Sequence, residues 1–210
     1  MARARTVQRR EENEIEFSRI VAFSDGVFAI AITLLVLNLS VPEHISSGHL
    51  TRVLWDQRQD VFAYALSFAV IGRFWLVHHR FFGDVVGFDG RLLALNLFYL
   101  AWIVLIPFSS QVLGDHGDDT GAVVLYAVNL AGVTLIGNWM ATDARRAGLA
   151  TTPDEVARTG TRRALTIAAI FLGSIPLALI DPHIAPYLWL VMFLTFGWVF
   201  RTTSRPPPGE

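Results

Sequence analysis

The sequence contains no cysteine and no lysine, so all 17 of its basic residues are arginines. Without cysteine there can be no disulfide, no thiolate metal site and no thiol nucleophile. Charge is also scarce, at 17% of residues against about 25% in soluble domains. The net charge is −1 and no basic patch lies outside the expected loops, which argues against nucleic acid as a partner. These absences argue against a soluble enzyme, a disordered tail and a secreted disulfide scaffold.

What the chain has in their place is apolar sequence: 53% of its residues are hydrophobic and the mean hydropathy is +0.45. Several uncharged stretches approach the ~20 residues that cross a hydrocarbon core. We therefore predict an all-α integral membrane protein with six transmembrane helices, at about 20–39, 61–77, 92–114, 120–142, 164–180 and 184–200. Asp25 interrupts the first span, Arg73 interrupts the second, and His78-His79-Arg80 is expected to end the second. The expected organisation is an N-terminal segment 1–19, a membrane domain 20–200 and a tail 201–210.

Arginine placement predicts the orientation of these spans. Fourteen arginines fall in the N-terminal segment, in the tail and in the loops on their side, whereas the opposite side has only Arg52 and Arg58. That opposite side carries Asp115, Asp118, Asp119 and Asp181 in its loops. Cytoplasmic loops of membrane proteins are enriched in Lys and Arg. The pattern places both the N- and C-termini in the cytoplasm.

Asp25 is the most informative residue of the first span, because an intramembrane carboxylate is costly unless it is paired or meets water. At about 100° per residue, Asp25 points about 140° away from Ile30, and Ser24 points about 120° away on the other side. The face centred on Ile30 is apolar apart from one threonine. Asp25 is therefore predicted to connect helices, with direct ion binding as the alternative. The apolar face comprises Phe23, Gly26, Ile30, Thr33, Leu34 and Leu37.

Partners for Ser24 and Asp25 are expected at the same membrane depth. The second span offers Trp75, His78 and His79, and the third offers Asn96, so indole, imidazole and amide groups could satisfy a buried polar cluster. A metal site at His78-His79 is disfavoured, because adjacent helical residues diverge by about 100° and no carboxylate lies three or four residues away. Neither a metal nor another cofactor is expected.

These residues resemble a known family. Arg19-x-x-x-Phe23-Ser24-Asp25, continuing into VFAIAITLL, is similar to the R-x-x-x-F-S-D motif of the lysosomal potassium channel family, the transmembrane-protein-175 family. Its bacterial members have a single six-helix repeat. Phe74-Trp75-x-x-His78-His79 matches the accompanying pattern in the second span, as do Leu95-Asn96 and Pro107-Phe108 in the third. The resemblance is strong over 19–108 and extends further only by hydropathy.

The resemblance implies a potassium-selective channel of the plasma membrane, in which the first helices of four identical subunits line the pore. The sequence has no TVGYG-like segment, so a carbonyl-ring filter of that kind is absent. Carried over by motif spacing, the constriction falls on Ile30, Leu34 and Leu37, and a selectivity threonine falls on Thr33. The resemblance gives a structural role to the motif residues Arg19, Phe23, Ser24, Asp25, Trp75, His78, His79 and Asn96.

Two other functions compete with a channel. A secondary transporter of a small cation or solute would use broken helices at the midplane, yet the first span has neither a mid-span proline nor paired glycines. An enzyme would need a nucleophile–base pair or a set of metal ligands, and the sequence offers neither. Arg73 is not part of the family pattern. Both snorkelling to the surface and pairing with Asp25 are open for it.

Overall fold

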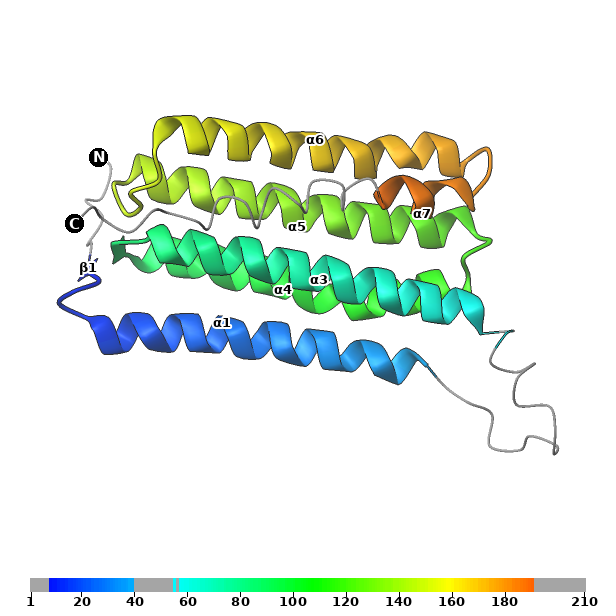
Figure 1. The fold of residues 1–210 in the computed structure, drawn as a ribbon, viewed down its shortest axis with the longest axis horizontal. Coiled ribbons are helices and arrows are strands. Elements are labelled where there is room, and N and C mark those ends of the chain that lie inside the picture. The colour runs from blue at the N-terminus through cyan, green and yellow to red at the C-terminus, as the bar shows by residue number, and fades with distance from the viewer. Residues whose placement is uncertain (1–7, 40–54, 56, 191–210) are drawn as a thin grey trace, which may run out of the picture.

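The computed structural model describes residues 8–39, 55 and 57–190, which form five long helices lying side by side (Figure 1). All five are long and apolar enough to cross a membrane. A short 3₁₀ segment extends the first helix, and a further short helix follows the fifth. The elements are β1 (Gln8–Arg9), α1 (Glu14–Leu34), η1 (Leu35–Asn38), α3 (Arg58–Asp84), β2 (Gly87–Phe88), α4 (Gly90–Asp115), α5 (Thr120–Arg146), α6 (Asp154–Ala178) and α7 (Ile184–Trp189).

The five long helices cover the first five expected spans, and several of them continue beyond the span limits. Helix α3 continues through the His78-His79-Arg80 run, where the second span is expected to end, as far as Asp84. Nothing in that run breaks a helix, and the chain turns extended only at Val85, whose ψ is 124°. The helix α7 begins at the start of the expected sixth span. Residues 191–210, which include most of that span and the whole tail, lie outside the described residues.

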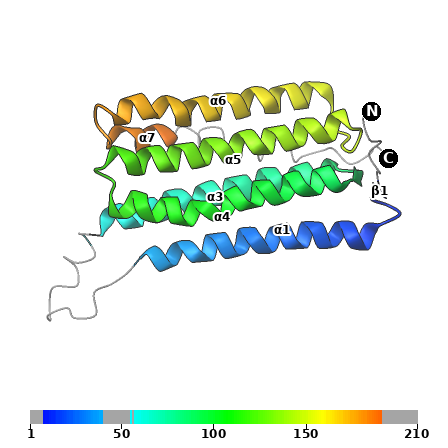
Figure 2. The same ribbon diagram turned by 180° about the vertical axis from the view of Figure 1, so that it is seen from behind.

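The packing order places α1 at one edge of the bundle and α6 at the other (Figures 1 and 2). Helix α1 contacts α3 and α4, α4 contacts α5, α5 contacts α6, and α7 contacts α6. Small residues permit the closest of these approaches. A Cβ on Gly132 of α5 would come within 2.1 Å of the Trp102 ring of α4, so only glycine fits there.

Two hydrophobic clusters hold the helices together. The larger runs through the middle of the bundle, with Phe28, Ile103, Tyr126 and Leu130 almost fully buried. This cluster also contains three buried hydroxyl groups that hydrogen-bond to one another. The Ser67 hydroxyl lies 2.7 Å from the Ser110 hydroxyl and 2.8 Å from the Tyr126 hydroxyl. The smaller cluster lies where α1 begins and α3 ends. It comprises Phe17, Phe82, Val85, Phe88, Leu92, Leu95, Met140, Ala144 and Leu149.

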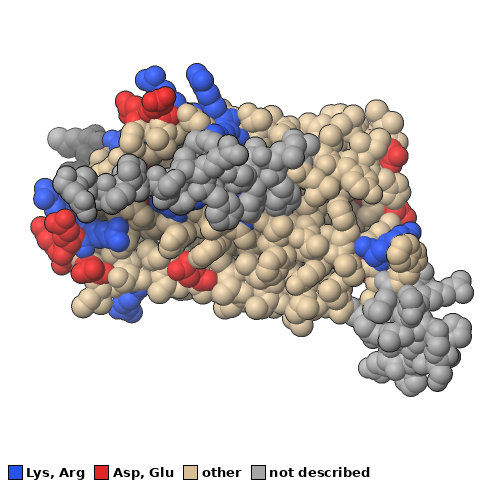
Figure 3. All heavy atoms as spheres, in the orientation of Figure 1, with Lys and Arg blue, Asp and Glu red and all other residues tan. Residues whose placement is uncertain are grey.

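Charged side chains gather at the end of the bundle that holds this smaller cluster, whereas the middle of the face shown in Figure 3 is almost uncharged. We call this end the arginine-rich end. It carries the start of α1, the α3–α4 connection and the α5–α6 connection. A two-stranded antiparallel pair, β1 with β2, also lies there, so the all-α prediction misses one small β element.

This small sheet joins three segments that are far apart in sequence. Gln8 pairs with Phe88 and Arg9 with Gly87, and the Arg10 N–H donates to the Val86 carbonyl at 3.0 Å. The Val86 N–H in turn donates to the Leu149 carbonyl of the α5–α6 connection at 2.9 Å. The strands have two residues each, too few to leave a periodic pattern in the sequence.

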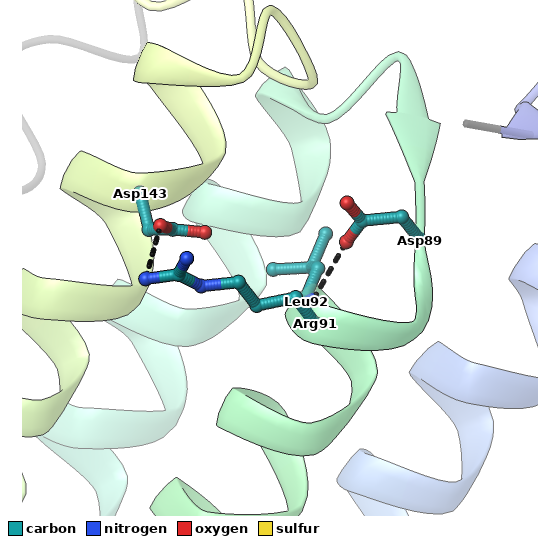
Figure 4. Close-up of polar contacts among 4 residues, drawn as sticks. All are labelled: Asp89, Arg91, Leu92 and Asp143. Atoms are coloured by element: carbon teal, nitrogen blue, oxygen red, sulfur yellow. Dashed lines mark hydrogen bonds and ion pairs between the residues drawn. The ribbon is translucent and has the colours of Figure 1, made fainter. Parts of the chain in front are cut away.

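The beginning of α4 is fixed by two carboxylates at the arginine-rich end (Figure 4). The Asp89 side chain caps the helix, because its Oδ1 accepts the Leu92 N–H at 2.8 Å. Arg91 reaches across to α5, where its guanidinium lies 2.9 Å from the Asp143 carboxylate. The Asp89 cap defines where α4 begins, and the Arg91–Asp143 ion pair joins this end of α4 to α5.

Candidate functional site: the first helix and its contacts

The first contact that holds α1 in place is made by Asp25. The Trp75 Nε1–H of α3 donates to Asp25 Oδ1 at 2.8 Å, and the indole ring stacks on His79 with centroids 5.5 Å apart. The carboxylate in the most apolar span is therefore satisfied by a neighbouring helix.

Directly beside it, Ser24, Asn96 and His78 form a buried chain that joins α1, α4 and α3. The Asn96 amide donates to Ser24 Oγ at 3.0 Å, and that hydroxyl donates to the Ile20 carbonyl at 3.0 Å. The Asn96 oxygen then accepts from His78 Nε2, 2.9 Å away. This assignment makes His78 the Nε2–H tautomer. The His78 imidazole therefore uses its N–H in a structural hydrogen bond between helices α3 and α4.

The aromatic surroundings of His78 extend this contact region. Its ring is almost parallel to Tyr99, with centroids 5.5 Å apart, and lies 5.3 Å from Phe28 of α1. Phe28 is 1% exposed. One stripe of α1 therefore faces the bundle, with polar contacts near its middle and apolar contacts on either side. Its buried members are Phe17, Ser24, Phe28 and Ala31, followed by Leu35 of η1.

The opposite face of α1 is uncovered. Ile30 is 60% exposed, Leu37 is 72% exposed and Phe23 is 56% exposed, although all three are large and apolar. Thr33 is the polar member of this face, and its hydroxyl donates to the Ile30 carbonyl at 2.9 Å. The structure thus divides the motif: Ser24 and Asp25 point to other helices, whereas Arg19 and Phe23 are exposed. We call Phe23, Gly26, Ile30, Thr33, Leu34 and Leu37 the exposed stripe.

Arg73 lies inside the bundle, 8% exposed, and does not extend to the surface. The Asp25 carboxylate accepts the Trp75 indole N–H. The role of Arg73 stays a prediction from the sequence. Its burial on α3 is a feature that the apolar pattern does not explain.

Two further contacts of α1 escaped the sequence reasoning. At its far end, the Asn38 amide donates to the Pro107 carbonyl of α4 at 3.1 Å. At the arginine-rich end, the Arg10 guanidinium lies over the Phe17 ring, 4.5 Å from its centroid, and donates to the Val85 carbonyl at 3.3 Å. The position of Asn38 near the end of the first apolar run could have indicated a hydrogen-bonding role for it. The contact of Arg10 depends on the small sheet and has no local signal.

Taken together, these helices define a multi-pass helical membrane protein whose first helix is held by polar contacts along one face only. Among the described residues, no group of three or more His, Cys, Asp or Glu side chains lies close enough to hold a metal ion.

Comparison with known proteins supports the same class. Residues 19–107 match the model of the endosomal/lysosomal potassium channel TMEM175 family. A potassium channel of Streptomyces collinus is 43% identical over 101 residues, which are 48% of this chain and 49% of that protein. The endosomal/lysosomal proton channel TMEM175 of Gallus gallus is 34% identical over 108 residues, covering 48% of this chain and 22% of that protein.

A solved structure extends the likeness to the whole fold. The lysosomal potassium-selective channel TMEM175 homolog from Chamaesiphon minutus superposes with a TM-score of 0.75 at 28% identity, over 90% of this chain and 99% of that one. The match to the bacterial curated relatives spans about half of their length. The resemblance to the TMEM175 family that the sequence predicts is confirmed.

Proposed function

We propose that the chain is one subunit of a passive, potassium-selective channel, and that four copies surround a pore lined by α1. The observation that carries this proposal is the exposed stripe: an apolar face on a helix whose other face is held by other helices. One α1 cannot enclose a pore, whereas several copies related by closed cyclic symmetry can. The relatives named potassium channels and the Chamaesiphon minutus structure support the same function.

The constriction in this proposal is formed by Ile30, with Leu34 and Leu37 further along the pore. Rings of such side chains block ions by bulk and by dewetting, because a narrow apolar passage holds water poorly. Thr33 is the selectivity residue. Since its hydroxyl proton is already donated to the Ile30 carbonyl, the oxygen lone pairs are the part left to face a cation.

The buried contacts of α1 have a structural role in this scheme. Ser24, Asp25, Trp75, His78, His79 and Asn96 hold α1 at a fixed rotation, and Arg19 and Phe23 belong to the same motif. A fixed rotation keeps the exposed stripe directed at the axis. Direct ion binding by Asp25 is not needed, because its Oδ1 already accepts the Trp75 indole N–H.

The topology we propose has six spans within a membrane domain of residues 20–200. Both the N-terminal segment 1–19 and the tail 201–210 are cytoplasmic, because the arginine-rich end belongs on the cytoplasmic side. The protein is then a multi-pass component of a bacterial plasma membrane, in contact with lipid and potassium ions, with no enzymatic activity and no resident cofactor.

The test is ion flux from purified protein in liposomes. Vesicles loaded with potassium should release it down its gradient without a coupling ion, and faster than matched vesicles release sodium. Protein-free vesicles give the background, and an added potassium ionophore shows that the remaining potassium is trapped. Proton entry is recorded in parallel, because the vertebrate relatives are named proton channels. Strict dependence of potassium movement on a proton or sodium gradient would instead make the protein a transporter.

A further inference from the structure

The outward face of α6 carries two arginines directly above an apolar surface. Arg158 and Arg162 are exposed and one helical turn apart, followed on the same side by Leu165, Ala169 and Leu172, all exposed. At about 100° per residue these five positions fall within an arc of about 80°. One helix face therefore changes from basic to apolar within a single turn, about 5 Å along the axis.

Neither guanidinium is committed to a partner in the described part of the chain. The neighbouring Arg145 forms an ion pair with Asp154, and Arg91 forms one with Asp143, but Arg158 and Arg162 have none there. They lie in the first half of α6, toward the arginine-rich end, and α6 forms the edge of the bundle opposite α1 (Figure 1). At these five positions this side of α6 is exposed.

We propose that Arg158 and Arg162 form a binding site for the phosphate of an anionic phospholipid headgroup. Arginine offers a planar fork of donors that matches phosphate oxygens, and its aliphatic stem can lie along apolar surface. The acyl chains would then follow Leu165, Ala169 and Leu172. A headgroup that bears its own ammonium offers less net charge to the pair, so the site prefers phosphatidylglycerol to phosphatidylcholine. The site is independent of ion conduction by α1.

Titration of the purified full chain with phosphatidylglycerol, followed by native mass spectrometry in neutral detergent, tests this site. Each arginine near a membrane surface contributes about a fivefold effect on affinity. Arg158→Gln and Arg162→Gln should each weaken binding about fivefold, and the double variant roughly 25-fold. Arg158→Lys/Arg162→Lys keeps both charges and loses the two guanidinium forks, so its affinity should fall between those of the wild type and the double glutamine variant.

Arg58→Gln is the matched control, because Arg58 is exposed at the opposite end of the bundle; it should bind like the wild type. Size-exclusion profiles verify that each variant is folded, as expected for exposed positions. Equal affinity of the wild type and the double glutamine variant would overturn the proposal, as would equal binding of phosphatidylglycerol and phosphatidylcholine. Displacement of the lipid by millimolar inorganic phosphate would also overturn it, by showing a site for free anions.

Discussion

The two faces of the first helix, α1 with its extension η1, are similar in composition and opposite in environment. Phe28 and Leu35 are 1% and 0% exposed, whereas Ile30 and Leu37, two residues further along in each case, are 60% and 72% exposed. The window of the first helix is the most apolar of the five membrane spans, yet only 22% of it is buried, the same share as in α6 and less than the 50% in α4 and α5. The apolar residues of the first helix therefore extend well beyond the face that packs inside one subunit.

The largest expected effect comes from emptying the buried face. Phe28→Ala removes a ring that contacts His78 and Tyr99 and leaves a cavity in the core. We expect the free energy of unfolding to fall by about 3–5 kcal/mol. Thermal unfolding in detergent measures the loss, and Ile30→Ala on the exposed face is the control, with a change below about 1 kcal/mol. Similar losses of unfolding free energy in Phe28→Ala and Ile30→Ala would contradict the assignment of Phe28 to a buried face and Ile30 to an exposed one.

A smaller effect is expected at the polar contact beside Phe28. Asp25→Ala leaves the Trp75 indole N–H without its acceptor, at a cost of about 1–3 kcal/mol. Asp25→Asn keeps an acceptor oxygen at the same place, so it should recover most of this loss. Size-exclusion and thermal-unfolding measurements compare the two variants. A fully stable Asp25→Ala with altered ion selectivity would mean that Asp25 faces the permeation path.

The smallest effect concerns the far end of α1. Asn38→Ala removes the amide that donates to the Pro107 carbonyl of α4. A single partly buried hydrogen bond of this kind contributes about 1 kcal/mol. Amide hydrogen exchange in η1 should accelerate while exchange near Phe28 stays unchanged, because the loss is local. Unchanged exchange in η1 would show that Asn38 does not hold this end.

Local sequence properties predict part of this structure, and tertiary packing determines the rest. Five spans and the grouping of Asp25 with Trp75 follow from hydropathy and from equal membrane depth, which are local or one-dimensional properties. The continuation of α3 past His78-His79-Arg80 was missed because that run marks a change in polarity, and polarity does not end a helix. Contacts such as Arg10 with Phe17, and the burial of Arg73, depend on tertiary packing that no local pattern encodes.

The central claim is that the exposed stripe faces a pore, and Ile30→Asn tests it most directly. Asparagine shortens the apolar barrier and supplies groups that hydrate an ion, so potassium flux per reconstituted protein should rise well above that of the wild type. Leu172→Asn, at a 43% exposed position on α6 at the opposite edge of the bundle, is the matched control and should leave flux unchanged. Equal effects of the two substitutions, or unchanged flux in Ile30→Asn, would contradict the assignment of this face of α1 to the pore.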